Sequence, residues 1–166
     1  MSSELSRKVS SRSGRRPVRP SQGFTVIELA LTLAAISVLV AVAVPTTVNT
    51  LRNLRLSAAV SAATGAISAT RYQAIMHAYP YNITFNSSNA TYQVASEPPG
   101  ASSFTNLGSA IPISGVGDVT INQTTTLQFN ANGTVTATTG TLTFTISNPL
   151  TTHTITVTGV GDVSVN

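Results

Sequence analysis

The sequence contains no cysteine, and its only two histidines are His77 and His153. Without cysteine, a disulfide scaffold, a thiolate zinc site, an iron–sulfur cluster and a cysteine nucleophile are all excluded. The histidines do not have the short spacing of a histidine metal site, and no serine lies in a Gly-x-Ser-x-Gly turn. We therefore expect neither an enzyme nor a bound cofactor.

Charged side chains are also scarce and make up 8% of the 166 residues. Six of the nine lysines and arginines and one of the five acidic residues lie in the first 23 residues, which gives that segment a charge of +5 and leaves −1 for the rest. A nearly neutral body has no broad attraction for phosphate backbones, so nucleic-acid binding is not expected. Arg52, Arg55 and Arg71 are expected to pair with neighbouring subunits or to face solvent.

Residues 24–44 form an apolar run of 21 residues with Glu28 as the one ionisable side chain. As a helix the run would span about 31 Å, which matches the hydrocarbon core of a bilayer. The basic segment 1–23 precedes it, so the positive-inside rule predicts a single-pass protein with its N-terminus in the cytoplasm. The remaining residues, 45–166, would lie on the other side of the membrane.

Glu28 is the residue that needs an explanation. A carboxylate in an apolar span costs several kcal/mol unless it stays near the headgroups, is protonated or finds a partner. Cleavage between Gly23 and Phe24 would create an α-amino group of the right charge, on the same chain or on a neighbouring subunit. Two alternatives remain: Glu28 reaches the interface without a specific role, or a signal peptidase cuts near Pro45 and releases a secreted β-rich binding protein.

The segment Gly23-Phe24-Thr25-Val26-Ile27-Glu28-Leu29, after a short basic leader, resembles the prepilin peptidase signal of type IV pilins and type II secretion pseudopilins. The resemblance implies cleavage after Gly23, N-methylation of Phe24 and a role for Glu28 in recruiting each subunit into a filament. Pro45 stands where pilins commonly carry a helix-breaking proline. Because it lacks an amide hydrogen and its ring clashes with the carbonyl of Ala41, it should kink or loosen the helix.

Residues 45–79 are predicted to continue as a helical stalk that ends before Pro80. One apolar stripe recurs there at spacings of three and four: Leu56, Val60, Ala63, Ile67, Ala74 and Met76. Beyond Pro80 the composition changes to short alternating runs typical of strands, at 81–85, 91–95, 119–122, 126–130, 134–138, 142–147, 152–158 and 163–165. Residues 97–110 lack periodicity and are expected to be a surface loop pinned by Phe104 and Leu107.

The expected fold is α+β, with a long N-terminal helix, half transmembrane and half stalk, packed on an antiparallel sheet that forms a head at residues 80–166. The inward residues of that sheet are predicted to be Leu127, Phe129, Val135, Leu142, Phe144, Ile146, Ile155 and Val157. This pattern is similar to the H-type minor pseudopilins (GspH) and the related FimT-like minor pilins.

The resemblance implies a structural subunit of a type II secretion pseudopilus in the bacterial inner membrane, with a periplasmic head. Its implied partners are other pseudopilins or pilins, the prepilin peptidase, the inner-membrane assembly platform and the lipid bilayer. The alternative is a minor type IV pilin that serves assembly, adhesion, twitching or DNA uptake. FimT-like pilins that bind DNA carry arginine in their final glycine-containing segment, whereas Asp162 follows Gly161 here.

An internal echo relates residues 114–122 to residues 158–166, each containing the sequence Gly-Val-Gly-Asp-Val. Glycine and aspartate favour tight turns, so the first interpretation is two similar turn-plus-strand units, paired as edges. The second is a cation site in which Asp118, Asp162 and backbone carbonyls bind calcium.

Overall fold

The computed structural model describes residues 23–115 and 117–166, so the predicted leader lies outside the described residues apart from Gly23. The chain divides after Val40 into two compact units, and the second comprises residues 41–166. All contacts between helix and sheet described below belong to this second unit. The only helix is α1 (Val26–His77) among the described residues, and the ten strands follow it.

Helix α1 runs through Pro45 without a break, so the predicted transmembrane and stalk segments are continuous in secondary structure. It ends where Ala78 adopts a positive φ of 58°, two residues before Pro80, which cannot donate to the helix. The residues buried along it are Leu56, Ala59, Val60, Ala63, Ile67, Thr70 and Ala74. The predicted stripe is confirmed except for Met76, whose side chain is 61% exposed. Met76 lies two residues, or about 200°, past Ala74 and therefore points away from the head.

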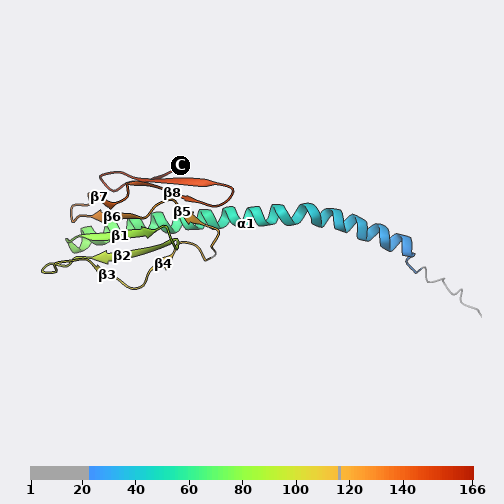
Figure 1. Cartoon of the computed structure of the whole chain (residues 1–166), viewed down its shortest axis with the longest axis horizontal. Coiled ribbons are helices and arrows are strands. Elements are labelled where there is room, and N and C mark those ends of the chain that lie inside the picture. Colours follow the sequence, from blue (N-terminus) through green and yellow to red (C-terminus); the bar gives the residue numbers. More distant parts are fainter. Residues whose placement is uncertain (1–22, 116) are drawn as a thin grey trace, which may run out of the picture. The chain divides into compact units, whose positions relative to one another are not determined.

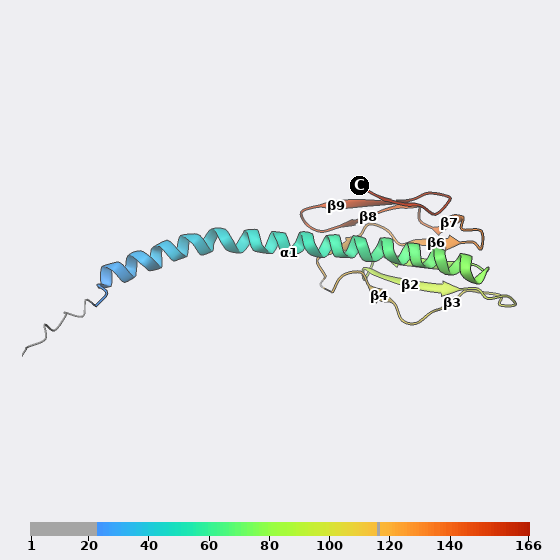
Figure 2. The same cartoon turned by 180° about the vertical axis from the view of Figure 1, so that it is seen from behind.

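The head contains two antiparallel sheets (Figures 1 and 2). Sheet A has the order β3-β2-β1-β6-β7, with β4 also paired to β2, and sheet B has the order β10-β9-β8-β5. The strands of sheet A are β1 (Tyr81–Asn86), β2 (Thr91–Ser96), β3 (Thr105–Asn106), β4 (Ile111–Pro112), β6 (Thr125–Phe129) and β7 (Val135–Thr139). Those of sheet B are β5 (Thr120–Ile121), β8 (Thr143–Ser147), β9 (Thr152–Val157) and β10 (Val163–Val165).

The eight predicted strands are all present, but they divide between two sheets where one was expected. The predicted loop 97–110 contains β3, and β4 begins directly after it. The amide of Leu107 donates to Val94 O at 2.8 Å and so ties this segment to β2. Leu107 itself is exposed and Phe104 is half-buried, so the segment is held mainly by its backbone.

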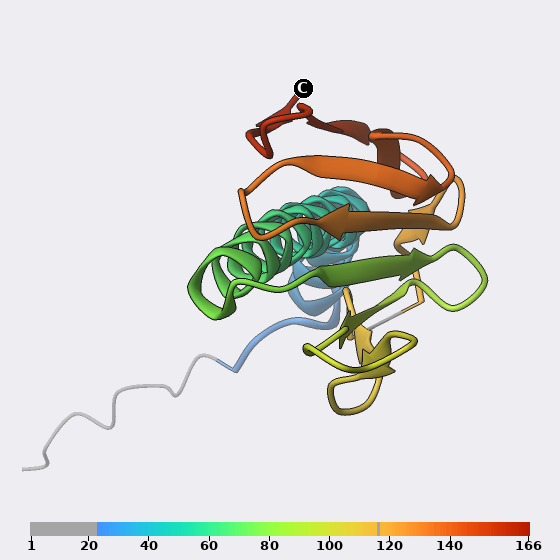
Figure 3. The same ribbon diagram turned by 90° about the vertical axis from the view of Figure 1, so that its left-hand side faces the viewer.

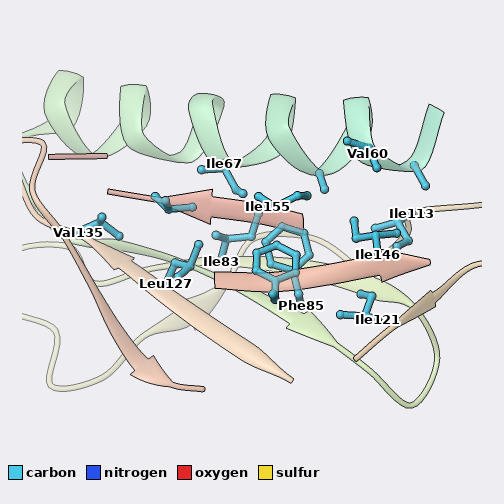
Figure 4. Close-up of a cluster of buried hydrophobic side chains, with 14 of the residues drawn as sticks. Val60, Ile67, Ile83, Phe85, Ile113, Ile121, Leu127, Val135, Ile146 and Ile155 are labelled. Carbon is cyan, nitrogen blue, oxygen red and sulfur yellow. The ribbon is translucent and has the colours of Figure 1, made fainter. Parts of the chain in front are cut away.

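One hydrophobic core lies between α1 and both sheets, and α1 presents a single buried face to the strands (Figures 3 and 4). The rings of Phe85, from sheet A, and Phe144, from sheet B, are 4.9 Å apart between centroids. All the predicted inward residues are buried except Leu142, which is partly buried against the core. The two sheets therefore share one core and fold together as one head.

Candidate assembly site

Helix α1 begins with a side-chain cap at Thr25. The amide of Glu28 donates to Thr25 Oγ1 at 3.3 Å, and the amide of Leu29 donates to Thr25 O at 3.1 Å. A threonine followed three residues later by glutamate is the pattern of a capping box, and a carboxylate in the first turn is favoured by the helix dipole. The Thr-x-x-Glu spacing was visible in the sequence, but its capping function was not part of the sequence interpretation.

Gly23, Phe24, Thr25 and Glu28 line one shallow depression at this end of α1. Phe24 is 81% exposed and Glu28 is also exposed. Glu28 has no ion pair within residues 23–115 and 117–166. Three residues that the sequence motif singled out, Gly23, Phe24 and Glu28, therefore lie around one depression, and Glu28 is exposed and forms no ion pair with the other described residues.

The first half of α1 is an apolar surface that the other described residues do not cover. An 18-residue window of the helix has a mean hydropathy of 2.5 and no buried residue. The exposed side chains include Val26, Ile27, Leu31 and Leu39. By length and composition this helix is long and apolar enough to cross a bilayer.

Pro45 is accommodated without an interruption in the assigned helix. The hydroxyls of Thr46 and Thr47 donate to Ala43 O at 2.8 and 2.9 Å, and Thr46 Oγ1 also donates to Val42 O at 3.2 Å. Threonine hydroxyls therefore supply donors to carbonyls around the position where proline removes an amide.

The two aspartates of the internal echo form ion pairs with arginines of α1. Arg55 Nη1 lies 3.2 Å from Asp118 Oδ2, and Arg71 Nη1 lies 3.4 Å from Asp162 Oδ1. We expected these arginines to pair with other subunits or face solvent, but both pair within the chain. Each aspartate is far from its arginine in the sequence, so local residue spacing could not predict these ion pairs.

The structure does not bring Asp118 and Asp162 together at one cation site. Asp118 precedes β5 and Asp162 precedes β10, and these strands are the opposite edges of sheet B. The echo units are therefore edges of the same sheet without being paired to each other. No group of three or more His, Cys, Asp or Glu residues suited to a metal occurs in the described part of the chain.

Asn148 is a further contact residue that the sequence interpretation missed. It is 9% exposed and follows β8. Its Nδ2 donates to Arg52 O at 3.0 Å and to Asn53 Oδ1 at 3.3 Å, while its Oδ1 accepts from the amides of Leu150 and Thr151. One side chain therefore shapes the turn between β8 and β9 and joins it to α1.

Comparisons with known proteins agree with this architecture. The family model described as type II transport protein GspH matches residues 59–161. The structure is similar to a crystal structure of the type IV minor pilin FimU of Pseudomonas aeruginosa (strain PAO1), with 17% sequence identity, a TM-score of 0.51 and coverage of 70% of this chain and 91% of that chain. A comparison with curated proteins found no match.

The similarity to FimU supports the fold: a long N-terminal helix packed on an antiparallel β head. The family match covers most of the second half of α1 and nearly all of the head. The chain belongs to the GspH family of minor pseudopilins within the pilin superfamily, and assembly with other pilins is the role of such subunits.

Proposed function

We propose that the chain is inserted in the bacterial inner membrane, cut after Gly23, methylated at Phe24 and assembled into a type II secretion pseudopilus. Residues 24–44 span the bilayer with the N-terminus in the cytoplasm, and the head lies in the periplasm. The observation that carries the proposal is Glu28: an exposed carboxylate without an ion pair among the described residues, next to the predicted cleavage site in an uncovered apolar helix.

In the filament the Glu28 carboxylate pairs with the amino group that cleavage creates on Phe24 of a neighbouring subunit. An isolated carboxylate among apolar helices is costly, so a subunit docks most favourably where a cation is available. The apolar helices pack on each other in the core of the filament and the β head faces outward. The function is mechanical, without catalysis.

The partners follow from these steps. The prepilin peptidase removes the leader, the inner-membrane assembly platform inserts the subunit into the filament, and other pseudopilins contact it there. We do not propose nucleic acid as a partner, since residues 24–166 carry a net charge of −1 and Arg55 and Arg71 are paired with aspartates. Neither a cofactor nor an enzymatic activity is needed for this role.

The alternative assignment is a minor type IV pilin of the FimT type. It uses the same processing, helix and head, so the site residues do not distinguish the two systems. Complementation of deletion strains separates them: restored export of a folded protein favours the pseudopilus, and restored twitching or DNA uptake favours the pilus. A secreted β-rich binding protein predicts a mature chain that starts near Pro45.

The structure gives a matched pair of variants that tests Glu28. Glu28→Gln removes the charge and retains a side chain compatible with the capping box, whereas Thr25→Ala removes the threonine cap and keeps the carboxylate. We expect Glu28→Gln to be inserted and cleaved but excluded from sheared or cross-linked filaments, and Thr25→Ala to be incorporated. Normal incorporation of Glu28→Gln would contradict the pairing, and equal loss in both variants would indicate a capping role alone.

A further inference from the structure

Both copies of the internal echo contain a Gly-Asp pair close to an edge strand of sheet B. Gly161-Asp162 directly precedes β10, whereas Val119 separates Gly117-Asp118 from β5, and only Gly161 has a positive φ. In each, a carboxylate oxygen of the aspartate meets Nη1 of an arginine from α1. The repeat therefore places equivalent ion pairs at the two edges of one sheet.

Arg55 and Arg71 lie on opposite sides of the buried face of α1. Taking Leu56 as the centre of the buried face, Arg55 lies about 100° to one side and Arg71 about 60° to the other, at about 100° per residue. Their separation of 16 positions in the sequence corresponds to about 24 Å along the helix axis. The two ion pairs hold opposite flanks of the helix at two well-separated axial positions.

The Arg71 side chain is also enclosed by two turns. A Cβ at Gly161 would lie 2.6 Å from Arg71 Nε and 2.7 Å from its Cδ, and a Cβ at Gly133 would lie 3.7 Å from Nε. The two turns are joined by the amide of Val135, which donates to Gly159 O at 3.0 Å. The absence of a side chain at Gly161 leaves the space that the Arg71 side chain occupies on its way to Asp162, whereas a Cβ at Gly133 would make only an ordinary contact with it.

Between the two ion pairs, α1 contacts the sheets through apolar side chains. The helix side of this contact combines the large side chains of Leu56 and Ile67 with small residues such as Ala59 and Ala63. Packing of these side chains opposes separation of the layers, and together with the Asn148 hydrogen bonds to Arg52 and Asn53 it also limits sliding of the helix. Hydrogen-bonded ion pairs depend on geometry and are lost when the helix slides.

We propose that the two Gly-Asp units are a pair of register locks that hold α1 at one axial and rotational position against sheet B. The locks are Arg55–Asp118 and Arg71–Asp162. A filament subunit is pulled along its N-terminal helix and meets resistance at its head, so these locks pass axial force from α1 to the head without slip. The force-transmitting role rests on the proposed function, whereas the locks themselves do not.

The test uses the full chain in detergent micelles. Because the sequence has no cysteine, cysteines introduced for Ser68 on α1 and Thr152 on β9, both exposed, carry spin labels at two defined positions. Double electron–electron resonance then gives the distribution of distances between the spin label on α1 and the spin label on β9. The parent is compared with the double variant Asp118→Asn and Asp162→Asn, and Glu97→Gln is the control because Glu97 forms no ion pair among the described residues.

We expect one narrow distribution for the parent and for the Glu97→Gln control. The double asparagine variant should show a broader distribution or a second population displaced by up to about 5.4 Å, one helical turn. Exchanging the charges of one pair, with Arg55→Asp and Asp118→Arg in the asparagine background at Asp162, should narrow it again. A distribution in the double asparagine variant as narrow as the parent's would overturn the proposal.

Two further readouts keep the result unambiguous. If the double variant does not fold, the parent is measured between low and about 1 M salt, where the Debye length falls to about 3 Å; broadening supports the locks and an unchanged width overturns them. Export of a folded protein by the asparagine variant is measured separately. A wrong assignment to secretion changes that second result and leaves the distance distributions untouched.

Discussion

Arg71 and Asp162 are 91 residues apart in the sequence, yet Nη1 of the arginine lies 3.4 Å from Oδ1 of the aspartate. The pair joins the last part of α1 to the final edge strand of sheet B. Arg71 reaches this position between Gly133 and Gly161. A surface ion pair contributes only about 0–1 kcal/mol to stability, and the role that we propose for this one is to favour one position of the helix.

Gly161→Ala should destabilise the head because Gly161 has a φ of +84° and a Cβ there would lie 2.6 Å from Arg71 Nε. We expect a loss of about 1–3 kcal/mol in the free energy of unfolding. Gly159→Ala is the matched control, since its Cβ would meet nothing within 4 Å and its φ is not in the left-handed region. Urea unfolding of the detergent-solubilised chain measures both, and equal effects would contradict the role of Gly161.

Asn148→Ala should also be destabilising, since it removes two hydrogen bonds that join the turn after β8 to α1 and two that hold the turn itself. The expected loss is about 1–3 kcal/mol, because buried backbone groups are left without partners. Asn89→Ala, at an exposed asparagine whose Oδ1 accepts from Thr91, should cost less. Hydrogen exchange should show faster exchange at Leu150 and Thr151 in Asn148→Ala; protection like that of the parent would be evidence against this role.

Stability should fall in alkaline solution because of Tyr81. Burial, the hydrogen bond to Tyr79 and the charge interaction with Tyr79 raise the pKa of Tyr81 from 10.0 to about 12. The folded state therefore holds the phenolic proton more tightly than the unfolded state. This contribution is complete below pH 10 and is lost as the pH rises from 10 towards 12.

The Tyr81 prediction is checked by thermal unfolding of the parent, Tyr81→Phe and Tyr72→Phe across this pH range. In Tyr81→Phe the unfolding temperature should fall less between pH 10 and 12 than it does in the parent. Tyr72 is exposed on α1, and its replacement should leave the decline as in the parent. An identical pH dependence in all three proteins would rule out Tyr81 as the source.

The shared core predicts that removing a ring from sheet B destabilises the whole head. Phe144 is fully buried and packs against Phe85 of sheet A. Phe144→Ala should cost about 3–5 kcal/mol, whereas the exposed Met76→Ala should change stability by less than about 0.5 kcal/mol. Fluorescence and hydrogen exchange should show both sheets unfolding in one transition, and separate transitions for sheets A and B would contradict a single core.

Local patterns in the sequence predicted most of the secondary structure. Alternation marked the buried residues of β6 and β8, and the three-and-four spacing marked the face of α1 that contains Leu56 and Ile67. The pattern was weak where burial was absent: β3 and β4 have two exposed residues each and gave no alternation. Their pairing depends on backbone contacts with β2, which composition does not reveal.

Long-range pairing is the part that the sequence left undetermined. Alternation shows which face of a strand is buried, but it carries no information about which strand lies next to it, so two sheets were read as one. The echo containing Asp118 and Asp162 was visible as a repeat, while its partners Arg55 and Arg71 were identified only in the folded chain. At Glu28, by contrast, the candidate was named from the local motif alone, and its role in assembly stays a prediction.

The mass and sequence of the mature N-terminus, measured on protein from the membrane of the native host, test the central claim most directly. The proposed assembly predicts a chain that begins at N-methylated Phe24, with the new amino group next to the motif that contains Glu28. A functional chain that retains its first 23 residues, or one that begins near Pro45, would contradict it.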